Sequence, residues 1–183
     1  MKKEELRKKY KEKRNNLLDV EITFFQESIY KQVFDLDISK VKNVHLFLSM
    51  RKFKEIDTNP LIDYFRSNKK RIVVSKCNFN NNTLSHFYFD EDTELMLNKF
   101  GVPEPNNTEE VSESELDLIF VPMLISDKNN YRVGYGKGYY DRFLSKCRKD
   151  VPIIGLNFFE PIKKIEDVNK FDIPLDKIIY PKE

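Results

Sequence analysis

The first forty residues repeat apolar side chains at the three- and four-residue spacing of helices. One set is Leu6, Tyr10, Leu17 and Leu18, and the next is Ile22, Phe25, Ile29 and Val33. This spacing predicts two amphipathic helices, and Asp19 stands where the first ends and the second begins.

A continuous apolar run between polar segments then predicts a buried strand at 44–48, and further strands are predicted at 71–75, 84–89, 116–122, 153–156 and 177–180. Asn59-Pro60 predicts a helix start between the first two strands. A strand, a helix and a strand within about thirty residues form the βαβ unit of a parallel sheet. We also expect a short helix over 94–100 that ends at Gly101, an extended segment over 101–105 and a surface connection over 106–115.

These elements predict an α/β fold in a single domain over 1–183, with an open, mostly parallel sheet and helices on both faces. Open sheets of this kind bind ligands at the carboxyl ends of their strands. The loops that follow Leu48, Val121 and Leu156 should therefore converge on one cleft.

Charge and cysteine content narrow the class of protein. The net charge is only +2, which argues against a general nucleic-acid coat. Residues 1–14 carry eight Lys or Arg against three Glu, and a solvated tail is the default interpretation of such a run. Lys3, Arg7 and Arg14 nevertheless fall near one side of the predicted helix and could bind an anion if that side turned inward. With two cysteines and no secretory or membrane-spanning run, we expect a cytoplasmic monomer that binds neither nucleic acid nor membrane.

A glycine-rich loop is the strongest chemical signal in the chain. Three of the five glycines, Gly134, Gly136 and Gly138, stand within five residues. Glycine lets another group approach the main chain, and exposed N–H groups can then bind a phosphate. Tyr140, Phe143, Leu144 and Cys147 predict a helix directly after the loop, so its N-terminus would face the same phosphate. A tight turn is the alternative, and neither the P-loop nor the dinucleotide-binding pattern fits this spacing.

Other familiar catalytic devices are absent from the sequence. His45 and His86 lie within predicted strands and are better explained as structural residues than as metal ligands. No nucleophile elbow is found, and neither Cys77 nor Cys147 has a histidine partner in sequence. Basic side chains, tyrosines and the carboxylates of Glu55, Asp141 and Asp172 remain. That set suits Mg²⁺, which takes one or two carboxylates together with phosphate oxygens.

The segment from Leu116 to Asp141, LDLIFVPMLISDKNNYRVGYGKGYYD, resembles the signature of the 5-formyltetrahydrofolate cyclo-ligase family. Shorter matches extend the resemblance over most of the chain. They are K-x-x-L-R at Lys3, Leu6 and Arg7, the segments 47–49 and 55–58, and Asp172 with 174–176.

The resemblance implies a reaction in which ATP phosphorylates the formyl oxygen of 5-formyltetrahydrofolate, with or without a polyglutamate tail. The N10 amine then attacks, and phosphate leaves as the methenyl ring closes. Arg132, Lys137 and Tyr139 would be catalytic, and Asp141 and Asp172 would hold Mg²⁺. The implied ATP contacts are Lys3, Arg7, Arg132, Gly134, Tyr135, Gly136, Lys137, Gly138, Tyr139 and Tyr140. The implied folate contacts are Leu48, Glu55, Tyr135, Gly136, Lys137, Gly138 and Tyr139.

Three departures from the family pattern stand out. The loop between Leu48 and Glu55 is about two residues longer, Ser75 replaces a proline, and Asn130 replaces a glycine. Two other functions stay open. A sugar-phosphate isomerase could use the same loop but lacks a placed general base, and an RNA-binding protein would need more net positive charge.

Overall fold

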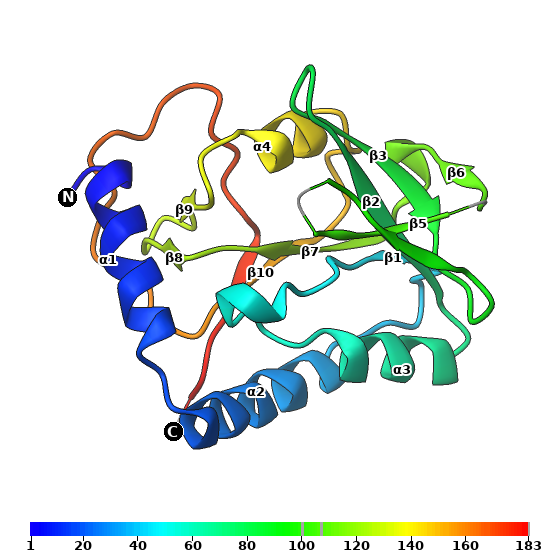
Figure 1. Cartoon of the computed structure of the whole chain (residues 1–183), viewed down its shortest axis with the longest axis horizontal. Helices are drawn as coiled ribbons and strands as arrows, with labels where there is room; N and C mark the ends of the chain where they lie inside the picture. The colour runs from blue at the N-terminus through cyan, green and yellow to red at the C-terminus, as the bar shows by residue number, and fades with distance from the viewer. Residues whose placement is uncertain (100, 107, 183) are drawn as a thin grey trace.

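The computed structural model, which describes residues 1–99, 101–106 and 108–182, is built on a seven-stranded sheet (Figure 1). The strand order is β11 (Lys177–Ile179), β10 (Ile153–Leu156), β7 (Leu118–Pro122), β1 (Asn43–His45), β2 (Arg71–Asn78), β3 (Thr83–Tyr88) and β6 (Glu110–Val111). The first five strands pair in parallel, β3 pairs antiparallel with β2, and β6 pairs antiparallel with β3. The predicted mostly parallel sheet is confirmed.

Helices cover both faces of this sheet, as predicted (Figure 1). α2 (Asp19–Phe34) and α3 (Asn59–Ser67) lie on one face, and α4 (Tyr139–Leu144) lies on the other. Alternate residues of a strand point to opposite faces. Accordingly Val44, Ile72 and Phe120 pack toward α2 and α3, whereas Val73 and Ile119 pack toward α4. Because both faces are buried at the centre of the sheet, β7 and β10 are apolar throughout, whereas β3 alternates buried and half-buried residues.

α1 (Lys3–Asn15) stands apart from these layers, against a two-stranded ribbon of β8 (Ile125–Ser126) and β9 (Arg132–Val133). Its apolar residues Leu6 and Tyr10 pack into a small core with residues of the ribbon and with Ile165. Residues 3–15 therefore form a docked helix, and the interpretation of 1–14 as a solvated tail is wrong. Among the described residues, no helix has the length and apolar character needed to cross a bilayer.

The predicted helix over 94–100 is also wrong. Its described part contains β4 (Leu95–Leu97), which forms an antiparallel ribbon with β5 (Pro103–Pro105); residue 100 lies outside the described residues. Gly101 makes the turn between them with a φ of 72°. The predicted surface connection contains β6 and a short 3-10 helix, η2 (Glu113–Glu115). A second one, η1 (Arg51–Phe53), lies within the long loop after β1.

Candidate active site

The loops that follow β1, β7 and β10 line one narrow hollow at the carboxyl edge of the sheet. Its lining residues are Phe47, Glu55, Ile56, Pro122, Met123, Leu156, Asn157 and Phe158, together with Arg14 of α1. The three strands are neighbours and run in parallel, so their carboxyl ends meet at this edge. The predicted convergence of these loops is therefore what the structure shows.

The glycine loop joins β9 to α4 and depends on left-handed backbone. Gly136 has a φ of 95° and Gly138 a φ of 71°, conformations that side chains other than glycine rarely adopt. A Cβ added to Gly136 would lie 2.9 Å from the guanidinium carbon of Arg7, whereas one added to Gly134 would meet nothing within 4 Å. Glycine at 136 therefore permits both the backbone turn and the close approach of Arg7. Asn130, which replaces a glycine of the family pattern, is also left-handed, with a φ of 62°.

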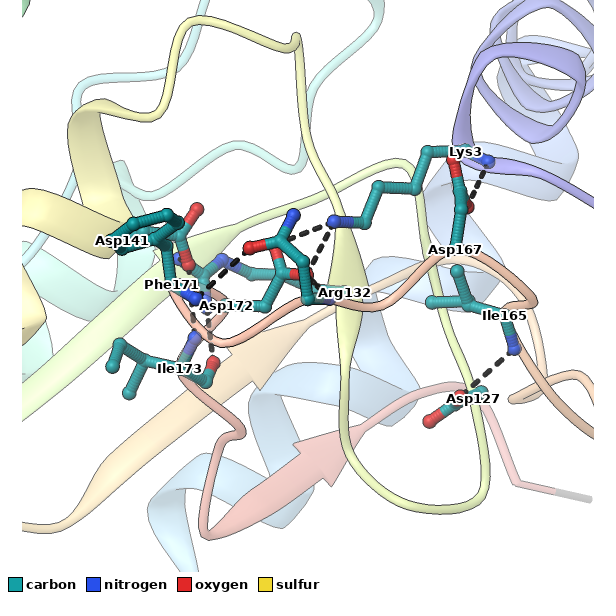
Figure 2. Close-up of polar contacts among 10 residues, drawn as sticks. Lys3, Asp127, Arg132, Asp141, Ile165, Asp167, Phe171, Asp172 and Ile173 are labelled. Atoms are coloured by element: carbon teal, nitrogen blue, oxygen red, sulfur yellow. Dashed lines mark hydrogen bonds and ion pairs between the residues drawn. The ribbon is translucent and has the colours of Figure 1, made fainter.

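α1 directs one cation to this loop and another to Asp172. The Arg7 Nε donates to the Gly134 carbonyl oxygen at 3.0 Å. Lys3 extends its Nζ to Asp172 at 2.6 Å (Figure 2). Arg14, further along the same side, is buried. The other lysines of the helix are exposed, so the basic run divides into an inward side and a solvated side.

The two carboxylates proposed to hold metal, Asp141 and Asp172, lie close to Arg132 (Figure 2). Arg132 is buried and donates at 2.8 Å both to the Asp141 Oδ1 and to the Ile173 carbonyl oxygen. Burial lowers the pKa of Arg132, and the charge of Asp141 opposes that shift. Asp172 accepts from Lys3 and from the backbone N–H of Asn169 at 2.6 Å. Each of the two carboxylates thus pairs with a cationic side chain of the protein, Asp141 with Arg132 and Asp172 with Lys3.

The donor set fits Mg²⁺ shared with a nucleotide rather than a preformed metal cage. Among the described residues, no group of three His, Cys, Asp or Glu side chains is arranged to hold an ion. Both contacts of Asp141 with Arg132 and Ile173 end on Oδ1, so they leave Oδ2 unused. Mg²⁺ is typically bound through one or two carboxylates plus phosphate oxygens and water. Asp141 and Asp172 can supply the two carboxylates, and bound phosphates would supply the remaining oxygens.

Arg14, Tyr135 and Glu55 form a buried chain of hydrogen bonds across three segments. The Arg14 Nη2 donates to the Tyr135 hydroxyl, and that hydroxyl donates to the Glu55 Oε1, each at 2.5 Å. The Glu55 Oε2 accepts from the Met50 N–H at 2.8 Å. Burial raises the pKa of the Glu55 carboxyl, against the opposing effects of Tyr135, the Met50 N–H and the Arg14 charge. Burial and Glu55 likewise raise the pKa of Tyr135.

The remaining predicted residues occupy different environments. Lys137 is exposed at the loop, and its carbonyl oxygen accepts from Arg142 at 2.8 Å. Tyr139 and Tyr140 are partly buried and pack against the core under α4, and burial raises the pKa of both hydroxyls. Leu48 is partly buried against the core on the opposite face. Within the described part of the chain, the geometry around Leu48 and Lys137 does not by itself assign either residue a role.

His45 and His86 are buried and joined through one hydroxyl. The Ser75 Oγ lies 2.8 Å from the His45 Nε2 and 3.0 Å from the His86 Nδ1. Both rings also pack on Phe143 of α4. Burial lowers the pKa of both histidines, that of His86 to about 4. These contacts support the structural interpretation, and Ser75 provides the link that proline could not.

A sequence model of the 5-formyltetrahydrofolate cyclo-ligase family matches residues 1–181. The chain belongs to the 5-formyltetrahydrofolate cyclo-ligase family. This cyclo-ligase is 37% identical over 123 residues to a probable 5-formyltetrahydrofolate cyclo-ligase of Schizosaccharomyces pombe, an alignment that covers 65% of this chain and 60% of the relative. It is 29% identical over 180 residues to a 5-formyltetrahydrofolate cyclo-ligase of Mycoplasma genitalium, covering 97% and 96%. Its membership makes it an enzyme of the ligase class.

Two solved structures share the fold of this chain. The 5,10-methenyltetrahydrofolate synthetase of Aquifex aeolicus superposes with a TM-score of 0.84 at 30% identity, covering 100% of this chain and 91% of that one. The synthetase of Mycoplasma pneumoniae superposes with a TM-score of 0.76 at 23% identity, covering 98% of each chain. At that identity the second likeness supports the fold alone.

Sequence reasoning placed Arg14 on the inward side of α1 but did not include it among the site residues. The one available signal was its spacing from Arg7, two turns earlier on the same side of the helix. Its partners, Tyr135 and Glu55, are distant in sequence. The convergence of the three loops was predicted, but Met123 and Phe158 were not named as lining residues.

Proposed function

We propose that this cyclo-ligase, as one domain over residues 1–183, uses ATP to convert 5-formyltetrahydrofolate into 5,10-methenyltetrahydrofolate with release of ADP and phosphate. The observation that carries the proposal is the position of the glycine loop. Arg7 of α1 donates to the Gly134 carbonyl oxygen of this loop, and Arg132 and Asp141, which pair with each other, flank the loop in sequence. Lys3 of α1 pairs with Asp172, whose charge also acts on Arg132. Cations, backbone N–H groups and carboxylates around one loop suit a nucleotide triphosphate.

In the proposed reaction the formyl oxygen attacks the γ-phosphorus of ATP and ADP leaves. N10 then attacks the activated carbon, the carbon–oxygen bond breaks, and phosphate departs with the original formyl oxygen. Loss of the N10 proton gives the methenyl cation. The protein forms no covalent bond in this sequence, so its contribution is orientation and charge neutralisation.

The chain's own residues divide this work. Lys3 and Arg7 contact the ATP phosphates, and Gly134, Gly136 and Gly138 bring backbone N–H groups close to them. Arg132, Lys137 and Tyr139 face the transferred group and stabilise its developing charge. Mg²⁺, when held by Asp141 and Asp172, supplies further neutralisation of the phosphate charge. Tyr135, Tyr140, Leu48 and Glu55 complete the walls on the nucleotide and folate sides.

Transfer of labelled oxygen tests this route. With ¹⁸O in the formyl group, the released phosphate is expected to carry one labelled atom for each methenyl product, because that oxygen leaves on phosphorus. Mass spectrometry of the phosphate measures it, and unlabelled MgATP without folate serves as the control. Unlabelled phosphate released together with methenyl product would contradict activation of the formyl oxygen.

A further inference from the structure

Arg14 is a buried cation with an unused hydrogen-bond donor. Its side chain lies in the hollow at the carboxyl edge of the sheet, and the residue is only 6% exposed. One terminal nitrogen reaches the Tyr135 hydroxyl and the other reaches the Met123 carbonyl oxygen at 3.5 Å. The Nε has no hydrogen-bond partner among the described residues. A buried guanidinium donor left unpaired is costly, so a ligand atom that satisfied it would bind favourably.

Glu55 places acceptors beside this donor. It lines the same hollow, is 8% exposed, and is linked to Arg14 through the Tyr135 hydroxyl. Each Glu55 oxygen accepts one protein N–H or O–H, and each can accept another bond. Three segments hold the pair in place, since Tyr135 comes from the glycine loop and Arg14 from α1.

The walls around the pair are largely apolar. Phe47, Ile56, Met123, Leu156 and Phe158 contribute to the lining. A donor next to acceptors between apolar walls complements one edge of a flat heterocycle, where a carbonyl oxygen adjoins ring and exocyclic N–H groups. The 2-amino-4-oxo ring of a reduced folate has that edge, with the 4-oxo oxygen beside the N3–H and the 2-amino group.

We propose that Arg14 determines specificity for the 4-oxo ring of the substrate by donating its Nε–H to that oxygen, while Glu55 accepts from N3–H and the 2-amino group. This inference rests on the proposed folate substrate. It assigns recognition of the ring to α1 as well as to the loop that follows β1. A site that hydrogen-bonds one substituent strongly rejects an analogue that lacks it.

The affinity ratio between 5-formyltetrahydrofolate and its 4-amino analogue tests the proposal. Dissociation constants would be measured by titration calorimetry without nucleotide, for wild type, R14M and K13M. Lys13 is the matched control, because it is an exposed cation on the same helix. R14M is expected to reduce the wild-type preference for the 4-oxo compound by about tenfold, and K13M is expected to keep it. Glu55 is present in all three proteins, so the change belongs to Arg14.

A preference in R14M equal to that of wild type would overturn the proposal. Because both ligands bind the same folded molecules, the ratio does not depend on the fraction of R14M that folds. R14K keeps the charge but has no Nε–H and should resemble R14M; recovery of the wild-type ratio would also overturn the role of Nε. Failure of wild type to bind 5-formyltetrahydrofolate at all would instead contradict the proposed function.

Discussion

Gly136 is the residue whose replacement separates a phosphate-binding loop from a tight turn. Gly136→Ala puts a Cβ 2.9 Å from the Arg7 guanidinium carbon and strains a φ of 95°. We expect the KM for ATP to rise about tenfold, because Arg7 must move, and stability to fall by about 1 kcal/mol. Steady-state kinetics and urea unfolding measure the two effects. Gly134→Ala is the control, since its Cβ would meet nothing within 4 Å; an unchanged KM in Gly136→Ala would support the turn alone.

Asp141 combines a structural role with the proposed metal role. Asp141→Asn keeps an acceptor for Ile173 but removes the charge opposite buried Arg132. We expect a stability loss of about 1–3 kcal/mol and a fall in kcat of at least about tenfold. The dependence on Mg²⁺ concentration should also shift upward. Wild-type turnover of Asp141→Asn at limiting Mg²⁺ would remove Asp141 from the metal site.

At the scale of elements, the apolar side of α1 anchors that helix to the rest of the molecule. Leu6 is 1% exposed and packs with Tyr10, Val133 and Ile165. Leu6→Ala should destabilise the protein by about 2–5 kcal/mol and weaken ATP binding, since α1 carries Lys3 and Arg7. Leu18→Ala, at 64% exposure, is the matched control and should stay within about 0.5 kcal/mol of wild type. Equal unfolding midpoints for the two variants would show that α1 is not docked through Leu6.

The sequence predicted the elements of the sheet better than those outside it. The buried strands have apolar runs that only a covered sheet explains, and all six predicted strand regions contain a strand. The helix predicted over 94–100 was wrong because the apolar residues there are not buried. Leu95, Met96 and Leu97 are all exposed in the ribbon of β4 and β5. Gly101 was predicted to end a helix, but it lies instead in the turn between the two strands of a ribbon.

The site was predictable where one segment carries it and not where several meet. The glycine loop and its helix are local, so spacing was sufficient to find them. The chain from Arg14 through Tyr135 to Glu55 joins residues 121 and 80 positions apart, and no local pattern encodes those pairings. Similarly, only tertiary structure brings Ser75 between His45 and His86.

At the scale of the whole molecule, the two buried histidines should make the folding stability decrease in acid. Their folded pKa values lie below the usual 6.5, that of His86 at about 4. Between these pH values the unfolded chain binds more protons than the folded one, so stability is full above pH 6.5 and falls as pH decreases toward 4. The slope is up to about 1.4 kcal/mol per pH unit for each histidine. The raised pKa of Glu55 acts in the opposite sense, lowering stability as pH rises.

Urea unfolding of wild type and His86→Gln from pH 7 to pH 4.5 measures this dependence. His86→Gln should be less stable at neutral pH through lost packing on Phe143, yet lose less stability on acidification. Asp117, whose pKa is lowered from 3.8, acts below this range. Parallel curves for the two proteins would show that His86 does not titrate on unfolding.

We propose that this chain closes 5-formyltetrahydrofolate to the methenyl compound at the expense of ATP. The most direct measurement is absorbance near the ultraviolet–visible border, where the methenyl product absorbs, after purified protein is mixed with 5-formyltetrahydrofolate and MgATP. We expect a rise in absorbance that requires both ATP and Mg²⁺, with one ADP formed for each methenyl product. No rise with folded protein at saturating substrates, or a rise of equal rate without ATP, would contradict it.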